Sequence, residues 1–552
     1  MSTIETQHGA YLGSEPLAGE YAVETTPLLR SNSDPNSSHT RSHTRENGGV
    51  ENSQEHLPTL PLLLDQFIIL LKSSLPVFGT HLLEYALLIT SVLAVGHLGK
   101  LELAACTLGS MTANVTSFSI VIGMGGALDT VLPGVWGANH IKLADSRLFG
   151  LWCQRMGVLY IFLLVPMLCI WLNAEGILIL LRQDKEVARL AGRYLAMLAF
   201  GLPAFSFNTI AKRYFQAQGL FSVPTKIGTI VAGVNFVLTG LFVYYPHPLP
   251  RTLAPYLHLG FDGAPLATAI SYNLVALGSV LWGWRIENEM RPAWHPLSVR
   301  ALHPTGLGVL LTLGLGGVGQ TASEWWAWEL VGLAASLLGP TALAAQSVLL
   351  VSCSTTYQVP FSLGVATSVR IGQLLGLARP RLAKLAAHAA ILLGFVLSLI
   401  FSVVFWIWRK EWSYLFNDDE DVAEMVASIL PLVALFQVFD GNAGITGGVL
   451  RARGKQGTGA LLNLSAYYVL GVPLGVYLAF KDVATAGLRG LWTGLTVSLV
   501  YCAVLGTILC LMTNWEHEVD KVRARMRAEE QRDCRENTRS DASDGSTFTD
   551  PY

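Results

Sequence analysis

The sequence has few charged residues and is strongly polar only toward its two ends. Of its 552 residues, 14% are charged and 51% are hydrophobic, whereas roughly 25% of the residues of a typical soluble domain are charged. The net charge of −2 offers no positive surface to a nucleic acid, so we expect no nucleic-acid partner. The central part of the chain is more apolar than the core of a water-soluble protein requires.

Motifs for nucleotide hydrolysis, metal binding and disulfide bonding are missing as well. The chain has no Gly-Lys-Ser/Thr loop of the Walker type, which excludes ATP hydrolysis as an energy source. It has no His-Glu-x-x-His motif, and its seven cysteines show no paired spacing, so we expect no metal site, no cofactor and no disulfide framework. These absences indicate that the protein is not an enzyme. The cysteines are at positions 106, 153, 169, 353, 502, 510 and 534.

Long apolar segments fill the chain between its polar ends. A membrane-spanning helix needs about 20 mostly apolar residues, and twelve such segments follow one another. The sequence therefore predicts an all-α integral membrane protein with twelve transmembrane helices. The predicted spans are 66–94, 103–130, 150–173, 188–211, 222–245, 263–284, 305–338, 341–366, 383–408, 422–449, 457–480 and 485–512.

Basic residues gather in alternate connections between these spans. Because cytoplasmic loops carry an excess of Lys and Arg, this pattern predicts that both ends of the chain are cytoplasmic. The connection after the ninth span is acidic instead. The basic residues assigned to cytoplasmic connections are Lys142, Arg147, Lys212, Arg213, Lys226, Arg285, Arg291, Arg300, Arg370, Arg379, Arg381, Lys384, Arg451, Arg453 and Lys455.

The two ends of the chain are expected to be disordered cytoplasmic tails, at residues 1–62 and 515–552, because they contain little apolar surface to bury. The second tail is predicted to begin with a polar helix over residues 516–532. The first tail shows no cleavable signal peptide, so we expect the first span to direct membrane insertion. It contains an acidic dileucine pattern from Glu24 to Leu29, which favours a vacuolar membrane; the plasma membrane is the alternative location.

The two halves of the membrane region resemble each other. The segment 97–105 aligns with 337–345 at an offset of 240 residues, and 215–219 aligns with 450–454 at an offset of 235. Each match falls at a connection that has the same place in both six-helix halves. An even number of helices per half predicts parallel repeats related by a pseudo-two-fold axis along the membrane normal. We therefore predict a lobe of helices one to six over residues 63–300 and a second lobe over residues 301–514.

Three acidic residues within the second lobe are candidates for function, because a charge inside a membrane is costly. Glu324 and Glu329 lie in the seventh span, and Asp440 lies in the tenth span between apolar residues. At about 100° per residue, the two glutamates are roughly 140° apart and cannot share one narrow face. Removal from water favours the protonated form of a carboxyl group. We predict that these residues bind protons and substrate.

Neighbouring polar and aromatic residues are candidates for lining the same cavity. Trp325 belongs to a tryptophan cluster whose ring faces suit flat or cationic ligands, although an aromatic belt at the membrane interface is the alternative. The remaining candidates for lining the cavity are Gln320, Gln346 and Asn442.

Charged residues in the first lobe have a weaker case. His81 and Glu84 are three residues apart on one helix face, so they form either a proton relay or a structural pair. Asp129 is expected to cap the end of the second span or to pair in solvent there. Arg370 is expected to extend from the end of the eighth span toward the interface.

Short strings spread over residues 66–512 resemble the multidrug and toxic compound extrusion family, in its eukaryotic, fungal type. No single string is specific, but the set occurs in the order found in that family. The strings are 95–105, 127–130 with 137–138, 215–219, 324–329, 345–347, 368–372, 447–451 and 468–473.

The resemblance implies an antiporter that exports organic, often cationic, compounds in exchange for protons or, less favoured here, sodium. It also implies that the acidic residues of spans seven and ten form the coupling and substrate site, which here are Glu324, Glu329 and Asp440. An aspartate common in the first span of bacterial and archaeal members is Ser91 in this chain. Coupling through the first lobe is therefore expected only if Glu84 or His81 takes over that role.

The leading functional hypothesis is thus a proton-coupled, monomeric exporter of small organic cations or other xenobiotics, working in a lipid bilayer by alternating access. A flippase for lipid-linked saccharides is the alternative. Such a protein is expected to hold basic residues in its cavity for a pyrophosphate group, whereas the candidate charges here are acidic.

Overall fold

The computed structural model describes residues 59–143, 147–244, 257–289, 296–416, 419–481 and 487–544. The dileucine pattern from Glu24 to Leu29 and most of the predicted first tail lie outside the described residues. Within them the chain forms helices and no strands.

The helices follow one another with short connections, as expected for a bundle. Their bounds are α3 Thr59–Gly96, α4 Lys100–Ala113, η2 Asn114–Phe118, α5 Ser119–His140, α6 Arg147–Leu172, α7 Ala174–Leu180, α8 Lys185–Ala199, α9 Leu202–Ala217, α10 Ser222–Tyr244, η3 Gly260–Asp262, α12 Gly263–Glu289, η4 Val299–Leu302, α13 Pro304–Ser336, α14 Pro340–Gly376, α15 Pro380–Ile407, η5 Ser413–Leu415, α16 Glu420–Ala452, α17 Gln456–Leu464, η6 Ser465–Gly471, α18 Val472–Lys481, α19 Gly487–Leu511 and α20 Trp515–Asp544.

The twelve predicted spans each correspond to a helix or a set of consecutive helices. By length and composition, ten described segments can cross a membrane, and α8 with α9 forms an eleventh that is bent by 51°. α13 stands at the position of the seventh predicted span and is 33 residues long. The second span continues to His140, beyond its predicted end at residue 130, through the π-helical turn η2.

The bend between α8 and α9 was not predicted, since residues 188–211 were expected to form one helix. Gly201 lies at the break, and a side chain there would collide with the backbone of Ala269 in α12. Pro203 follows near the start of α9, where the missing N–H of proline is tolerated. The close approach to α12 and the proline together place the break at this point.

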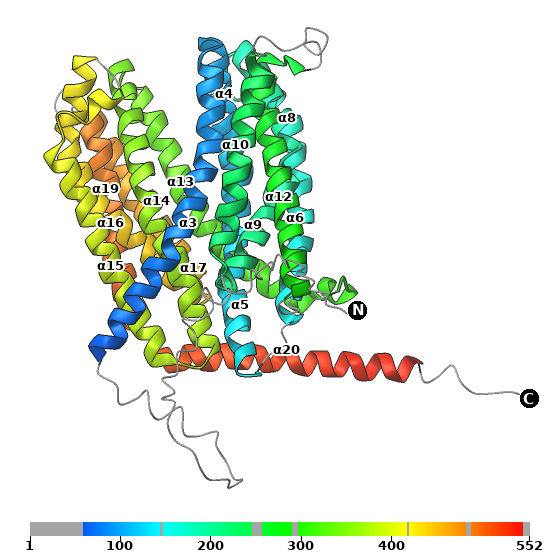
Figure 1. The fold of residues 1–552 in the computed structure, drawn as a ribbon. Helices are drawn as coiled ribbons and strands as arrows, with labels where there is room; N and C mark the ends of the chain where they lie inside the picture. The colour runs from blue at the N-terminus through cyan, green and yellow to red at the C-terminus, as the bar shows by residue number, and fades with distance from the viewer. Residues whose placement is uncertain are drawn as a thin grey trace, which may run out of the picture.

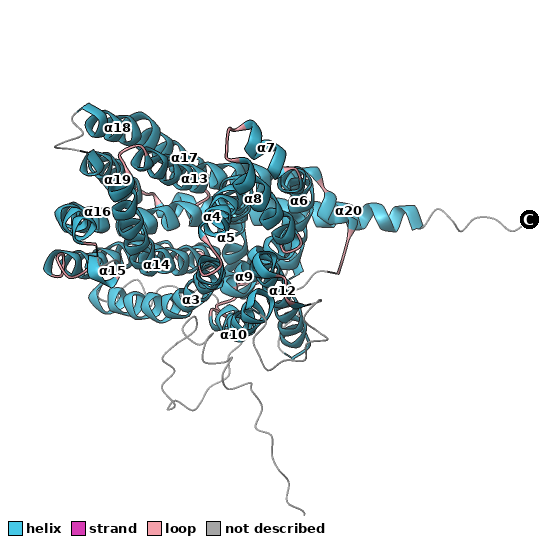
Figure 2. Ribbon diagram, turned by 90° about the horizontal axis from the view of Figure 1, so that it is seen from above, coloured by secondary structure: helices cyan, strands magenta, loops and turns pink. Residues whose placement is uncertain are grey.

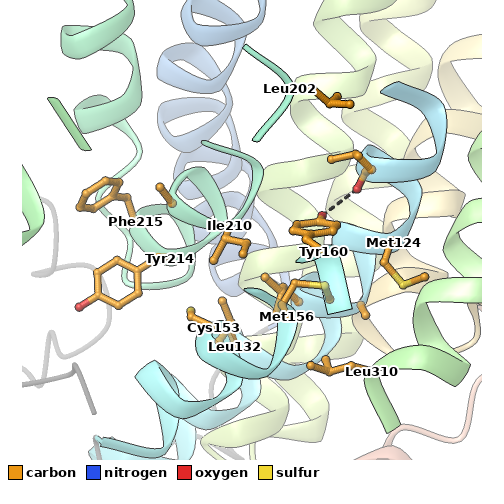
Figure 3. Packing of buried hydrophobic residues seen from close by; sticks show 14 of the residues in the cluster. Met124, Leu132, Cys153, Met156, Tyr160, Leu202, Ile210, Tyr214, Phe215 and Leu310 are labelled. Atoms are coloured by element: carbon orange, nitrogen blue, oxygen red, sulfur yellow. Dashed lines mark hydrogen bonds between the residues drawn. The ribbon is translucent and has the colours of Figure 1, made fainter. Parts of the chain in front are cut away.

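The helices form two lobes, and one long helix of each lobe crosses to the other (Figure 1). The first half of α3 contributes Leu70 to a core with Leu363, Leu393 and Ile445 of the second lobe. The first half of α13 contributes Leu310 to the core of the first lobe, where it lies near Met124 and Met156 (Figure 3). Seen from above, α14, α15, α16 and α19 lie to one side and α6, α8, α9 and α12 to the other (Figure 2).

The predicted relation between the halves is confirmed by where their helices end. α3 and α13 end 240 residues apart, as do the starts of α4 and α14. The backbone of Gly219 after α9 has a φ of 84°, and that of Gly454 after α16 has a φ of 67°, at the predicted offset of 235. Glycine adopts this left-handed conformation after a helix without strain. The same helix end is therefore built twice.

The lobes meet closely at the end of the bundle where α20 lies. Contacts between α5 and both α13 and α14 join them. A side chain at Gly137 would collide with the carbonyl oxygen of Gln373, and one at Gly376 would collide with that of Gly134. The Gln373 amide also donates a 3.0 Å hydrogen bond to the carbonyl of Ala217 in α9. We refer to this contact of residues 126–138 and 370–376 as the lobe interface.

The polar helix predicted over residues 516–532 is longer and more ordered than expected. α20 runs from Trp515 to Asp544 and passes beneath both lobes (Figure 1). Its Trp515 and Val519 are buried in a cluster of the second lobe, and its Met526 is buried in the core of the first. The start of the predicted second tail is thus part of the packed structure.

We predict that Gly137→Ala destabilises the protein, because the added methyl group overlaps the backbone of α14 at the lobe interface. Overpacking of this kind costs about 1–3 kcal/mol, which lowers the thermal unfolding midpoint measured in detergent. Gly157→Ala is the matched control, because a methyl group there meets open space. Equal midpoints for the two variants would contradict the close contact.

Candidate functional site

Several basic residues assigned to cytoplasmic connections lie within helices instead, and this changes their partners. Lys212 and Arg213 belong to α9, Arg370 to α14 and Arg451 to α16. Contrary to the prediction, Arg370 does not extend toward the membrane interface. It is buried, and its Nε donates a 2.9 Å hydrogen bond to Oε1 of Gln66 in α3.

In the first lobe, Glu84 is engaged by a lysine that sequence reasoning did not connect to it. The Lys212 ammonium donates hydrogen bonds to both carboxylate oxygens of Glu84, at 2.7 and 3.0 Å. Nδ1 of His81 lies 3.2 Å from the same carboxylate. Glu84 and Lys212 border a cavity of about 40 Å³ that also contacts Asn208. The predicted pair of His81 and Glu84 exists, but Lys212 already satisfies the carboxylate.

Asp129 neither caps a helix end nor pairs in solvent, because α5 continues to His140 and the carboxylate is buried. Its Oδ1 accepts a 3.0 Å hydrogen bond from Nε of Arg213 in the first lobe. Its Oδ2 lies 3.7 Å from Nε of Arg451 in the second. Removal of a carboxylate from water costs several kcal/mol unless it is paired, and here two guanidinium groups compensate for it. The cluster joins the lobes electrostatically.

In the second lobe, Glu324 and Asp440 lie close enough for their charges to interact. Asp440 is 6% exposed, and Glu324 is half-buried. In the part of the chain that the structure describes, neither carboxyl group forms a hydrogen bond or an ion pair, but the Arg451 guanidinium lies within electrostatic range of Glu324. The hydroxyl groups of Tyr357 and Tyr467 also lie within electrostatic range of both carboxyls. The four side chains come from α13, α14, α16 and η6.

The π-helical turn η6 and a side-chain amide complete this region. Tyr467 lies within η6, and an extra residue in a helical turn redirects the side chains around it. The Asn463 amide donates a 3.0 Å hydrogen bond to the carbonyl of Gln320. The Gln320 amide itself packs against Gly447 and Gly459, and its Oε1 is buried without a hydrogen-bond partner among the described residues.

The other predicted site residues lie apart from this group. Glu329 is half-buried on another face of α13 and, within the described ranges, has no ionic partner. Trp325 is half-buried, and its neighbour Trp328 packs edge-on against Phe436 and Trp492. Oε1 of Gln346 accepts a 2.8 Å hydrogen bond from the Trp492 indole. The Asn442 amide donates a 3.0 Å hydrogen bond to Oγ1 of Thr507.

The repeat explains why the two lobes treat their carboxylates differently. At the offset of 240, Glu84 corresponds to Glu324. At the offset of 235, Lys212 corresponds to Gly447. Where the first lobe places a lysine beside its glutamate, the second lobe has no side chain, and Gln320 and the guanidinium of Arg451 lie against that space. Asp440 corresponds to Phe205, so the second carboxyl is present in one lobe alone.

This arrangement gives the second lobe a chemistry that the first lacks. A carboxyl group without a fixed cation can take up and release a proton or bind an organic cation. Sequence reasoning found both acids because charges are rare in apolar spans. It missed Tyr357 and Tyr467, since tyrosine is common in such helices. Lys212 could have been found by comparing the two halves position by position.

Comparisons with known proteins agree with the repeat and the fold. The family model named MatE matches residues 76–241 and 318–477, one match for each lobe. An uncharacterised transporter of Schizosaccharomyces pombe is 37% identical over 82% of this chain and 81% of its own length. The multidrug and toxin extrusion protein 2 of Mus musculus is 33% identical over 82% of this chain and 75% of its own.

A solved structure shows the same architecture. The crystal structure of the eukaryotic MATE transporter AtDTX14 superposes with a TM-score of 0.75 at 28% identity, covering 85% of this chain and 100% of that one.

We predict that a hydrophobic carbodiimide, which reacts with protonated carboxyl groups, labels Glu324 and Asp440 but not Glu84. The reason is that Glu84 is held by an ammonium group, whereas the other two have no ionic partner in the described structure. Mass spectrometry of the labelled peptides measures this difference. Lys212→Met is the control and should make Glu84 reactive. Labelling of Glu84 in the unmodified protein to the extent of Glu324 would show that the Lys212 pair does not protect it.

Proposed function

This chain belongs to the MatE family of membrane transporters, and from this premise we propose that it exports small organic, often cationic, compounds in exchange for protons. The relatives named as multidrug and toxin extrusion proteins support export of organic compounds. The membrane-embedded carboxyl groups support a proton as the coupling ion. Monomeric function in the bilayer is part of the proposal, since a single chain holds the complete candidate site.

One observation carries the proposal. Of two glutamates at equivalent positions in the repeats, Glu84 is bound by Lys212, whereas Glu324 lies near Asp440 and, among the described residues, has no ion pair and only the more distant Arg451 within electrostatic range. The Lys212 ammonium compensates for the charge of Glu84, so a further cation gains little there. The pair of Glu324 and Asp440 has two carboxyl groups and one guanidinium within electrostatic range, so we place coupling and substrate binding in the second lobe.

The proposed mechanism is competition for the same carboxyl groups. Protonation of Glu324 and Asp440 removes the negative charge that holds an organic cation, so proton binding and substrate binding oppose each other reciprocally. A proton entering down a membrane potential contributes about 2.3 kcal/mol per 100 mV. Tyr357 and Tyr467 lie within electrostatic range of both carboxyl groups, and we propose that they line the same site. Trp325, Gln346 and Asn442 remain candidates for lining the path.

The end of the bundle that carries α20 is proposed to face the cytoplasm. Lys142, Arg300, Arg379, Arg453 and Lys455 lie in the connections at this end, as the excess of basic residues in cytoplasmic loops requires. Because the lobes are joined there, we propose that this conformation closes the cytoplasmic side. Location in the vacuolar or the plasma membrane stays a prediction from the dileucine pattern.

We predict that Asp440→Asn and Glu324→Gln each abolish efflux of a fluorescent organic cation driven by an imposed pH gradient in proteoliposomes. Each change removes a group that exchanges the proton for the cation while keeping the volume of the side chain.

Glu84→Gln is the matched control, because it alters the repeat-equivalent residue that is already paired. It should retain at least roughly a fifth of the transport rate, since loss of a partly exposed ion pair costs only about 0–1 kcal/mol. Full pH-driven transport by Asp440→Asn would refute the mechanism. Loss of transport in Glu84→Gln alone would move coupling to the first lobe.

A further inference from the structure

α20 is the one described helix after the last span, and its buried side chains form a single stripe. Trp515, Val519, Val522 and Met526 recur at intervals of three or four residues, which at about 100° per residue places them on one face. Glu518 and Glu529 are 11 residues apart, or close to three full turns, and flank the same stripe. Such a pattern is typical of a helix that lies on a protein surface.

Each end of this stripe is bound to a different lobe by a buried ion pair. Glu529 lies 3.3 Å from Arg155 of α6 in the first lobe, and both side chains are almost fully buried. Glu518 lies 3.2 Å from Arg453, which follows α16 in the second lobe. Two carboxylates of one surface helix are thus removed from water and matched by arginines on opposite lobes.

Between these two pairs, α20 covers the lobe interface. α20 contacts α5 of the first lobe and α14 and α15 of the second. A side chain at Gly134 would lie 3.6 Å from Val522, so Val522 sits against the lobe interface. Arg525 is close to Gly454, and burial lowers the pKa of its guanidinium, while the charges of Glu518 and Glu529 act in the opposite direction.

We propose that α20 is a strap across the two lobes that must release Arg155 from Glu529 before the lobes can separate at this end. The inference rests on the proposed alternating-access function, because separation of the lobes at this end is the step that the strap opposes.

The first-lobe end is the one that releases, because it is held by fewer contacts. Trp515 and Val519 share a core with four helices of the second lobe, and the guanidinium of Arg453 lies 6.0 Å from the Trp515 ring. Only three residues join α19 to α20, so the start of α20 moves with the second lobe. At the other end, Met526 and the pair of Glu529 with Arg155 provide the attachment.

Hydrogen exchange of the full-length protein in detergent, read by mass spectrometry over residues 130–140 and 370–378, tests the strap. Glu529→Gln should increase exchange in both segments by about 5- to 150-fold, the range of typical coupling between sites. Asp520→Asn is the matched control, because Asp520 is exposed on the same helix and its loss should leave exchange unchanged. The exchanged pair Arg155→Glu with Glu529→Arg should restore slow exchange.

The strap is overturned if Glu529→Gln and Asp520→Asn give the same exchange at the lobe interface, or if faster exchange is confined to α20. It is also overturned if the double variant Arg155→Glu with Glu529→Arg fails to restore slow exchange although its unfolding temperature equals that of the unmodified protein. Exchange is measured without substrate or pH gradient. Full pH-driven transport by Asp440→Asn with normal exchange would therefore count against the proposed function and leave the strap standing.

Discussion

A charge inside an apolar bundle has to be paired or neutralised, and this constraint organises the molecule. Asp129 satisfies it with an arginine from each lobe, which fastens the lobes together. Glu84 satisfies it with Lys212. Glu324 and Asp440 lie near each other without an ion pair in the described structure, and the one guanidinium within electrostatic range of Glu324, that of Arg451, is shared with Asp129. The structural role of Glu84 and the proposed functional role of Glu324 thus differ by the presence of one lysine.

Duplication supplied two equivalent frameworks that then took different roles. The helix ends at Gly219 and Gly454 kept the same left-handed backbone, because the chain must turn in the same way in both lobes. The side chains around the glutamates diverged, since folding does not require them to be alike. The first lobe pairs its glutamate with Lys212, and the second has glycine at the position equivalent to that lysine.

The spans, the two lobes and the acidic candidates could be predicted from the sequence, because hydropathy and repeat spacing are local properties. The depth of single charges could not. A hydropathy window averages over Lys212, so the lysine was placed in a connection when it lies inside α9. The bend at Gly201 depends on contact with Ala269, which is distant in sequence. The partners of Glu518 and Glu529 are arginines more than 60 residues away in the sequence. The C-terminal segment was therefore predicted to be less ordered than it is.

The crossing of α3 and α13 has a mechanical consequence. Each helix is anchored in one lobe by its first half and in the other by its second, through Leu70 and Leu310 at equivalent positions. Any rotation between the lobes therefore has to flex both helices. Pro76 and Gly316 stand at equivalent positions about two turns before each glutamate, and proline is a common site of bending in a helix. Flexing of α3 or α13 before this point would therefore change the angle at which the carboxyl group of that helix meets the opposite lobe.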